Sequence, residues 1–492
     1  MNIQDAGTVV RQLRLDFLGS REVVLEPVND YLSTDGGLLV IREWDEKLGW
    51  TAGFTSQLHD DRNQAWVQHP VIDMVRSRVF GILAGYEDQN DHDGLRSDAV
   101  FKLISGRLPN EADLASQPTL SRFENAVSPT DLLALEEWFC HRFVSNLEQP
   151  KGTLMLDMDV FDDPTYGDQQ LTFFHGFYEQ YQYLVRVMTC ANNDQVIIPT
   201  LLYGTARPTL GVDDDLRRIV TGVRARFPAQ HIHFRADSGF ATPAIYELCD
   251  ELQIDFSIGL PMNAVLQRKS QELLDEAQAA FDETGRPQRL FTGFEYQAKS
   301  WSKARWVIVK CEVTAQGTNR RAVVTNRPGA QVCPGAAYDE YADRGESENR
   351  NKELKREFSS DRLSDHRYMA NFFRLFLHCL ANNLLVDIRQ RCADQSTGLH
   401  STRTDAGQLG SDPLPTEALA GRERRKHFNH RHRQDPLGEG HASTWRMMII
   451  KVAARIKVTC RRVYVQVSGS WPYLERLLKL GDQAIGHRVE TS

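Results

Sequence analysis

The sequence predicts an α/β fold with a mixed sheet at its centre and a helical region before it. Residues 1–148 carry apolar residues at helical spacing, and a breaker cluster at 149–152 separates them from the rest of the chain. After this cluster come four strand-like runs, and then two helices that alternate with two further strands. Alternating elements of this kind indicate a sheet that is at least partly parallel.

The elements of the predicted core can be placed in order along the chain. The first strand, at 153–160, ends in carboxylates. The helix at 242–252 has Thr242 as its N-cap and Pro243 in its first turn, which is typical of a helix start. The remaining core elements are expected as strands at 170–177, 183–190, 196–203, 231–234 and 254–260, and as a helix at 210–227.

Residues 262–330 break the rhythm of alternating strands and helices. A polar helix at 270–283 is followed by alternating runs at 289–298, 305–313 and 320–325, with a turn marked by Gln316-Gly317. This pattern predicts a small antiparallel β insertion.

A polar helical stretch at 338–358 and a strongly apolar helix at 368–388 complete the predicted core. The composition at 393–442 is that of a flexible linker with a basic run at 422–433, and a helix and a strand are expected beyond it. We therefore expect six segments, at 1–148, 149–261, 262–330, 331–392, 393–442 and 443–492.

Composition limits the class of protein. The 492-residue chain has no run of 18 apolar residues, no apolar signal-peptide core and eight scattered cysteines without a CxxC pair. These features favour a cytoplasmic protein with reduced thiols and no membrane contact. The formal net charge of −8 opposes nucleic-acid binding when the chain is taken as a whole, but the distribution of charge matters more than its sum.

The stretch 338–358 carries an unusual stripe. Tyr341, Arg344, Glu348, Lys352 and Lys355 are spaced three, four, four and three residues apart, so they share one face of a helix. One interpretation is a solvated helix with ion pairs between successive turns. The other is a carboxylate flanked by cations and a phenol, as suits a divalent metal beside a phosphate backbone.

Carboxylates also end two predicted strands. Asp157 and Asp159 are two residues apart, so both face the same side of their strand. Asp237 follows the strand at 231–234, and carboxylates at the carboxyl ends of strands are placed as in the active clefts of open sheets. Aspartate at a strand end is also common turn chemistry, and 162–165 is a candidate for such a turn.

The spacing Tyr341, two residues, Arg344, three residues, Glu348, six residues, Lys355 matches a known signature. The chain thereby resembles the bacterial insertion-sequence DDE transposases with a Y-R-E-K motif. The resemblance implies an RNase H-like mixed-sheet core with an antiparallel β insertion and a helical N-terminal DNA-binding region. It also implies that Tyr341, Arg344 and Lys355 contact DNA.

The resemblance carries the catalytic triad over to named positions. Asp159 lies in LDMDVFDDPT, which matches the family's first motif except that Phe161 replaces a threonine, and Asp157 is its rival as first ligand. Asp237 in RADSGF matches the second carboxylate, and Glu348 is the third. In such enzymes the three residues hold two Mg²⁺ ions, for which Mn²⁺ can substitute.

Two further positions are expected to contact DNA. Trp301 lies between Ser300 and Ser302 in a polar loop, and a Trp of this insertion stacks on a flipped base in the resembling group. Trp306 alternates within a strand and is expected in the core. Arg122 belongs to the segment QPTLSR, which recurs in the family and suits either DNA contact or an ordinary capped helix.

The resemblance implies a function. The expected enzyme binds the terminal inverted repeats of its insertion sequence as a homodimer, cleaves double-stranded DNA by metal-assisted hydrolysis and joins the 3′ ends to target DNA. A different RNase H-like nuclease and a catalytically inactive DNA-binding repressor are the alternatives.

Overall fold

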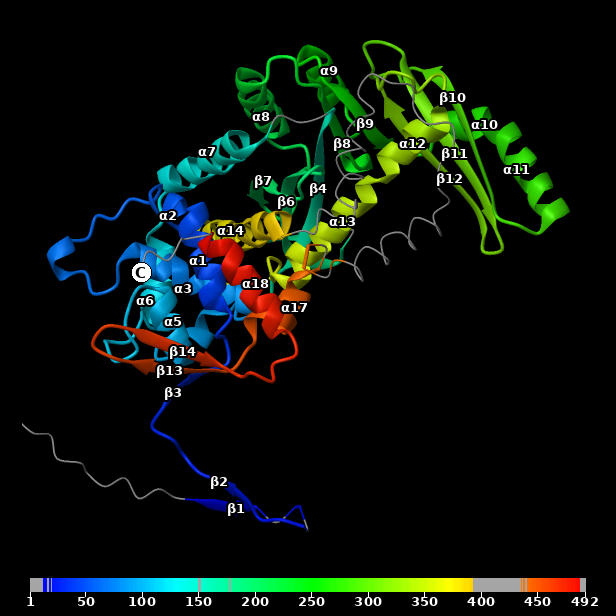
Figure 1. Ribbon diagram of the computed structural model, residues 1–492. Coiled ribbons are helices and arrows are strands. Elements are labelled where there is room, and N and C mark those ends of the chain that lie inside the picture. Colours follow the sequence, from blue (N-terminus) through cyan, green and yellow to red (C-terminus); the bar gives the residue numbers. More distant parts are fainter. Residues whose placement is uncertain are drawn as a thin grey trace, which may run out of the picture.

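The computed structural model describes residues 12–15, 17–18, 20–148, 152–176, 178–392, 435, 437–438 and 440–486. The basic run at 422–433 and nearly all of the expected flexible linker lie outside the described residues. Within the described part, strands form three sheets of two, nine and three strands (Figure 1). None of the helices found there combines the length and apolar character that a membrane span requires.

The nine-stranded sheet contains the predicted core. Its strands β4 (Leu154–Pro164), β6 (Gln180–Cys190), β7 (Val196–Leu202), β8 (Ile232–Ala236) and β9 (Asp255–Leu260) lie in the order β7-β6-β4-β8-β9. Strand β8 is parallel to β4 and β9, whereas β6 is antiparallel to β4 and β7. The expected mixed sheet is confirmed, and this order is that of an RNase H-like core.

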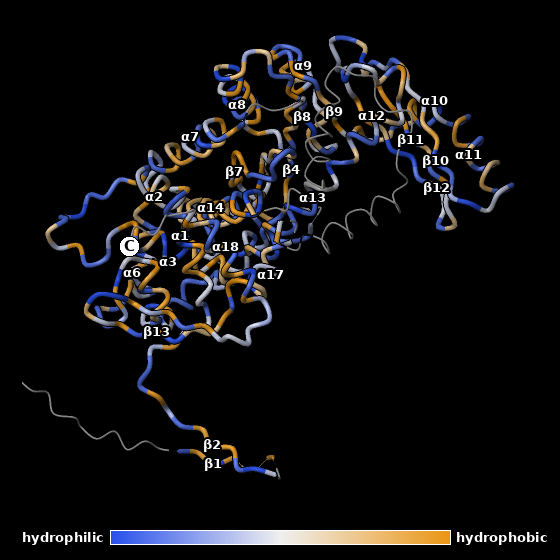
Figure 2. The backbone as a smooth tube through the Cα atoms, in the orientation of Figure 1, coloured by the Kyte–Doolittle hydropathy of each residue, from blue (hydrophilic) through white to orange (hydrophobic). Residues whose placement is uncertain are grey.

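Side chains alternate between the two faces of this sheet. Leu154, Leu156 and Met158 pack with α8 (Val212–Arg226) and α9 (Pro243–Glu251). Phe161 of the same strand packs in a different cluster, with α14 (Tyr368–Cys392) and the N-terminal helices. The apolar part of α14 is visible where it meets the sheet (Figure 2).

Helix α14 is the predicted apolar helix, and it extends four residues beyond the expected end at 388. It lies between β7 and α3 (Val71–Ala84). Asn383 fixes it to the sheet, since its Oδ1 accepts from the Val196 amide at 2.9 Å and its Nδ2 donates to the Val196 carbonyl at 2.7 Å. The buried end of β7 therefore has its backbone satisfied by a helix side chain.

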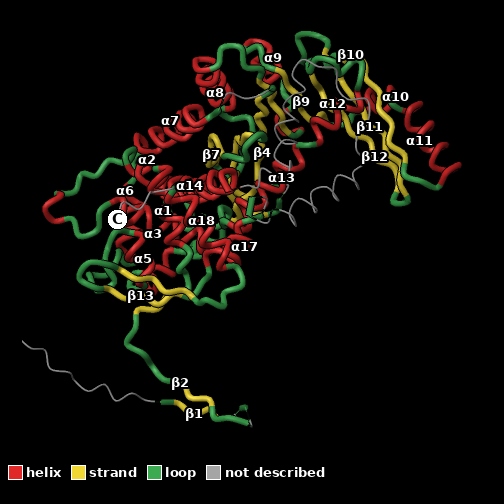
Figure 3. The backbone as a smooth tube through the Cα atoms, in the orientation of Figure 1, coloured by secondary structure: helices red, strands yellow, loops and turns green. Residues whose placement is uncertain are grey.

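The β insertion forms as predicted and also lengthens the core sheet. It contains α10 (Ala264–Lys269), α11 (Gln271–Thr284), β10 (Gln288–Tyr296), β11 (Arg305–Thr314) and β12 (Gly317–Thr325). The three strands are antiparallel, and β12 pairs with β9 from Ala322↔Leu260 to Thr325↔Ser257. The yellow strands of the insertion thus continue the core sheet beyond β9 (Figure 3).

The N-terminal region is mostly helical, as expected, but its first strands were not predicted. Its helices are α1 (Leu38–Leu48), α2 (Trp50–Thr55), α3, α4 (His92–Leu95), α5 (Ala99–Ile104), α6 (Gln117–Ala126) and α7 (Pro129–Asn146), with 3₁₀ turns at Gln64–Trp66 and Gln89–Asp91. The unpredicted strands are β1 (Leu13–Leu15), β2 (Val23–Leu25) and β3 (Tyr31–Ser33).

The C-terminal segment joins this N-terminal region. After α17 (Ala442–Trp445) and a π-helical turn (Arg446–Ile450), β13 (Ala454–Val458) pairs with both β14 (Val463–Val467) and β3. Helix α18 (Leu474–Ile485) packs on α1, where Trp44 Nε1 donates to the Leu480 carbonyl at 3.2 Å.

Two further expectations concern the segments around the carboxylates. The candidate turn at 162–165 is not observed, because β4 continues to Pro164 and pairs with β6 along its whole end. The helical stretch at 338–358 is confirmed as α12 (Pro334–Ala342), α13 (Arg344–Lys352) and a π-helical turn (Glu353–Glu357). Only Asp343 separates α12 from α13.

Replacing Asn383 tests its role in docking α14. Asn383→Ala leaves the amide and carbonyl of Val196 buried without partners, so we expect a loss of roughly 2 to 4 kcal/mol in unfolding free energy. Chemical denaturation measures this. Asn382→Ala is the matched control, since Asn382 contributes only one longer bond, 3.3 Å, to Asn383 Oδ1. Equal losses in the two variants would show that Asn383 does not hold the helix through Val196.

Candidate active site

Two of the predicted carboxylates lie level where the parallel pairing between β4 and β8 ends, although β4 itself continues to Pro164. The last paired residues of β4 and β8, Met158 and Ala236, are followed directly by Asp159 and Asp237. Gly259 follows at the same level in β9, and a Cβ built on it would lie 3.5 Å from the carbonyl carbon of Asp237. The sheet therefore brings together residues that are 78 positions apart.

Asp159 occupies a partly buried position with several polar neighbours. Its Oδ2 accepts from Arg344 Nη1 at 3.2 Å and from Asn351 Nδ2 at 3.1 Å. Burial and, to a smaller extent, the charge of Asp237 raise the pKa of Asp159 to about 6, against the lowering effect of Arg344. Because burial makes the charged form of Asp159 unfavourable, an added cation would stabilise this carboxylate.

Asp237 is held by its own loop. It caps the 3₁₀ turn Ser238–Phe240, with Oδ1 accepting from the Gly239 amide at 2.9 Å. One carboxylate oxygen is thereby fixed in direction, and the side chain is only partly buried.

Glu348 reaches the same group through Arg344. Arg344 Nη2 lies 2.8 Å from Glu348 Oε1, while its Nη1 contacts Asp159, so one guanidinium bridges two of the three carboxylates. Burial lowers the pKa of Arg344, but Asp159, Tyr341, Glu348 and Asp237 together raise it above its ordinary value. Arg344 thus partly offsets the negative charge of these carboxylates.

Tyr341 lies over the end of β9. A Cβ at Gly259 would be 2.7 Å from the Tyr341 hydroxyl and 3.1 Å from the Ser238 amide, so only glycine leaves room for the phenol. Burial raises the pKa of Tyr341, and the ring centroid lies 5.9 Å from the Arg344 guanidinium carbon.

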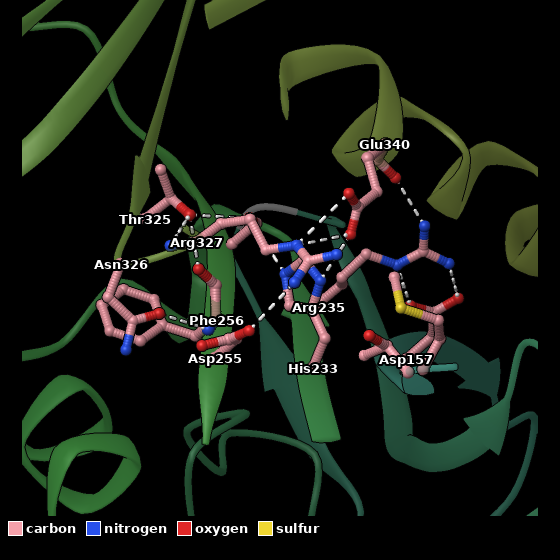
Figure 4. Close-up of polar contacts among 12 residues, drawn as sticks. Asp157, His233, Arg235, Asp255, Phe256, Thr325, Asn326, Arg327 and Glu340 are labelled. Carbon is pink, nitrogen blue, oxygen red and sulfur yellow. Dashed lines mark hydrogen bonds and ion pairs between the residues drawn. The ribbon is translucent and has the colours of Figure 1, made fainter. Parts of the chain in front are cut away.

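A buried ionic network fixes α12 directly beside these residues (Figure 4). Glu340 accepts from Arg327 Nε at 3.1 Å and lies 2.8 Å from His233 Nδ1, and its carbonyl accepts from Arg235. Arg327 also contacts Asp255 at 3.1 Å. This network joins β8, β9 and the segment that follows β12 to the helix that carries Tyr341.

The network also separates the two candidates for first ligand. Asp157 is 1 % exposed and forms a two-point ion pair with Arg235, at 2.6 and 2.7 Å. Its strand partner in the parallel ladder is Arg235 itself. Asp157 therefore has a structural partner, whereas Asp159 faces Arg344 and Asp237.

Sequence reasoning missed Arg235, Glu340, Asn351 and Gly259. The parallel register could have suggested Arg235, because it precedes Asp237 by two residues just as Asp157 precedes Asp159. Asn351 lies one turn after Glu348 on the same helix. The role of Gly259 depends on which helix covers β9, and no local pattern contains that information.

Lys355 contacts β4 at Asp162, three residues beyond Asp159. Its Nζ is 2.8 Å from Asp162 Oδ1 and 3.9 Å from Asp361 Oδ2, and it lies 5.9 Å from the Phe161 ring centroid. The residue that departs from the family motif, Phe161, therefore packs beneath the signature lysine.

The expected exposure of Trp301 is wrong. Its side chain is 7 % exposed and packs edge-on against Tyr246 and Tyr296, each with ring centroids 5.3 Å away. The polar loop turns the indole inward, so it cannot stack on a base in this arrangement. Trp306, expected in the core, is partly buried and covers Gly293.

Arg122 lies on the surface of α6, far along the chain from the carboxylates. It is exposed, and its Nη2 donates to Thr119 Oγ1 at 3.1 Å. Its helix is anchored by Glu124, which is fully buried between Arg78 at 2.8 Å and Arg374 at 2.5 Å. Arg122 is thus presented to solvent by a firmly held helix.

The carboxylates suit a hard divalent cation in their donor chemistry, since Mg²⁺ prefers carboxylate oxygens. Burial and mutual repulsion at Asp159 also favour a cation there. Among the described residues, however, no three His, Cys, Asp or Glu side chains converge closely enough to hold a metal ion. With Arg344 between Asp159 and Glu348, the residues fit such an ion only after this guanidinium moves aside.

Comparison with known proteins identifies the family. Residues 16–404 match the family described as Transposase DDE domain group 1, a span of more than half the chain. The protein belongs to this family of DDE transposases. A solved structure, the cryo-EM synaptic complex of piggyBac transposase with hairpin DNA, is similar with a TM-score of 0.41 and 12% identity, covering 81% of this chain and 85% of that one. No curated protein matches the chain.

The raised pKa of Asp159 predicts a pH-dependent stability. Because burial penalises the charged form, the penalty is fully present above about pH 6 and fades as the pH falls towards the ordinary value of 3.8. Asp159→Asn removes the penalty, so we expect a gain on the order of 2 kcal/mol at pH 8 and none near pH 4. Denaturant unfolding with a chelator present measures this.

Asp157→Asn is the matched comparison. It breaks the buried pair with Arg235 and should cost about 3 to 5 kcal/mol at pH 8. A destabilised Asp159→Asn protein at pH 8 would mean that the Arg344 ion pair outweighs the burial of Asp159.

The contact between Gly259 and Tyr341 predicts a coupled pair of substitutions. Gly259→Ala places a methyl group against the phenol hydroxyl, so we expect a loss of roughly 1 to 3 kcal/mol in unfolding free energy. Tyr341→Phe removes that hydroxyl and should recover much of the loss in the double variant. Gly345→Ala is the control, because a Cβ there meets no atom within 4 Å. Additive losses would contradict this contact.

Proposed function

We propose that this chain is the transposase of an insertion sequence. It binds the terminal inverted repeats of its element, cleaves the DNA and joins the 3′ ends to target DNA. The observation that carries the proposal is the level placement of Asp159 and Asp237 on adjacent parallel strands, with Glu348 tied to Asp159 through Arg344. Carboxylates that converge in this way from different elements suit phosphodiester chemistry.

Asp159, Asp237 and Glu348 are the residues that would hold two Mg²⁺ ions, for which Mn²⁺ can substitute. When bound, such ions activate the attacking oxygen and stabilise the leaving one. The Asp237 capping bond keeps one oxygen directed by the loop, and the Asp157–Arg235 pair holds β4 and β8 in register beneath the site.

Arg344 and Lys355 supply positive charge for the DNA backbone. Each is paired with carboxylates in the free protein, Arg344 with Asp159 and Glu348, and Lys355 with Asp162. Both would exchange these partners for phosphate oxygens when DNA enters, because guanidinium and ammonium groups bind phosphates strongly. Tyr341 would donate a hydrogen bond beside them from its fixed place over Gly259.

Sequence-specific binding is assigned to the N-terminal region. Arg122 is exposed on α6 and can reach the groove or backbone of double-stranded DNA. Two ends must meet for strand transfer, so we expect a homodimer in the DNA complex.

Glu348→Gln tests the catalytic assignment. The substitution keeps the size of the side chain and removes its charge, so Mg²⁺-dependent nicking of terminal-repeat DNA should fall at least roughly 100-fold. Binding should be unchanged or tighter, because repulsion between carboxylates and phosphates decreases. Nicking assays and gel-shift titrations on the same DNA measure both effects.

Asp159→Asn and Asp237→Asn should behave like Glu348→Gln, while Glu475→Gln, an exposed carboxylate of α18, serves as the control. Full nicking by Glu348→Gln would remove Glu348 from the site. Nicking without joining of 3′ ends by the wild-type protein would favour a nuclease, and binding without nicking would favour a repressor.

A further inference from the structure

Exposed aromatic side chains gather in one short part of the chain. Ten large aromatic side chains are exposed among the described residues, and six of them lie between positions 166 and 203: Tyr166, Phe173, Phe174, Tyr178, Tyr181 and Tyr203. Exposed aromatic clusters on soluble proteins usually mark a binding surface. We call β5 (Phe173–His175), Tyr178 and Tyr181 the aromatic hairpin.

The rings of the aromatic hairpin are arranged in pairs. Phe174 and Tyr181 are direct partners across β5 and β6, with ring centroids 5.6 Å apart at 67°. His175 and Tyr178 lie 5.0 Å apart. Phe174 is 52% exposed and Tyr181 58%, so these side chains contact each other and remain open to solvent.

The backbone under these rings is well supported. Gly204 lies so close that a Cβ there would be 2.1 Å from the Gln182 carbonyl and 2.7 Å from that of Phe173. The Tyr183 hydroxyl donates to the Gln170 carbonyl at the base of the hairpin. The exposed rings are therefore held by a fixed backbone, which lowers the entropy cost of binding.

The aromatic hairpin borders the candidate active site. Tyr181 lies two residues from Tyr183, which pairs with Asp163 of β4, so alternation places Phe174 and Tyr181 on the sheet face of Asp159. Gln180 Nε2 donates to Asp162 Oδ2 at 2.9 Å, and Lys355 holds the other oxygen of that carboxylate. The hairpin is thus joined to the signature lysine through Gln180 and Asp162, which alternate to the opposite face of the sheet from Tyr181.

Electrostatics support this placement. Burial raises the pKa of Tyr178, and the negative charges of Asp162, Asp237 and Asp159 raise it further. The Tyr178 hydroxyl therefore lies close enough to Asp159 and Asp237, two of the three candidate catalytic carboxylates, for their charges to affect its pKa.

We propose that the aromatic hairpin is a stacking platform for unpaired bases of the DNA strand next to the cleaved phosphate. The proposal rests on the proposed function and names the part of the substrate that this surface takes. A base in an intact duplex is stacked on both sides, so only an unpaired base offers a free face to Phe174 or Tyr181. A phosphate held by Lys355 would bring its neighbouring nucleotides to this surface.

The surface suits bases better than a second protein chain. Edge-to-face contact between Phe174 and Tyr181 leaves a ring face available, and stacking on nucleobases uses such faces. His175 and Gln180 add hydrogen-bonding groups beside the rings. Lys355 is linked to Gln180 of the same hairpin through Asp162, and a cation close to exposed aromatics is a usual combination in single-strand binding.

The test compares two forms of the terminal-repeat DNA, one fully paired and one with two unpaired nucleotides beside the cleavage position, each carrying 2-aminopurine there. The double variant Phe174→Ala/Tyr181→Ala should lose affinity for the unpaired form by roughly 5- to 150-fold per stacked base and bind the paired form as the wild type does. It should also lose the fluorescence quenching of 2-aminopurine.

Two further variants separate stacking from folding. Phe174→Tyr/Tyr181→Phe keeps both rings and should restore binding and quenching. Phe174→Leu/Tyr181→Leu keeps an apolar surface without aromatic faces and should remain defective. Trp66→Ala removes an 83% exposed ring elsewhere and should leave both readouts unchanged.

The outcomes decide between this proposal and its rivals. Unchanged affinity for the unpaired form, or an equal loss on both forms, would overturn the platform. Loss of self-association in sedimentation, with DNA binding retained, would make the surface a contact between two copies instead. If the wild-type protein does not nick repeat DNA at all, the proposed function fails, whereas quenching in a single-stranded oligonucleotide still tests the platform.

Discussion

The buried ionic network around Glu340 is the constraint on which the rest of the site depends. It places three cationic or titratable side chains, His233, Arg235 and Arg327, against the carboxylate and carbonyl of one helical residue. Charges buried this deeply are tolerated only when every partner is present, so α12 has one position on the sheet. Tyr341 and Arg344 come directly after it in sequence, and their approach to Asp237 and Asp159 is therefore set by a structural pairing one turn earlier.

The same sheet face carries a structural pair and a candidate catalytic pair at successive positions along β4 and β8. Asp157 and Arg235 form the buried pair, and Asp159 and Asp237 come next, where the parallel pairing of β4 and β8 ends. One carboxylate is fully neutralised by an arginine of the neighbouring strand, while the next is left short of positive charge, with a pKa raised to about 6. This difference between residues two positions apart is what favours Asp159 as the group that takes a cation.

Arg344 is the cation that lies between two of the candidate catalytic carboxylates. Its guanidinium contacts Asp159 and Glu348 and is itself within the field of Asp237. The aromatic hairpin adds apolar surface beside this charged centre, where the buried Trp301 supplies none.

The sequence by itself determined the order of strands and helices in the core, the β insertion and the helical stretch at 338–358, because hydrophobic periodicity is a local property. A spaced motif is equally local, and it gave the resemblance that singled out Asp159, Asp237 and Glu348. Only the tertiary structure decided which residues meet. Three features depend on contacts between distant segments. They are the burial of Trp301 between Tyr246 and Tyr296, the pairing of Asp157 with Arg235, and the continuation of the core sheet into the insertion. The β4 extension to Pro164 overrode a local turn signal, because pairing with β6 satisfies its backbone.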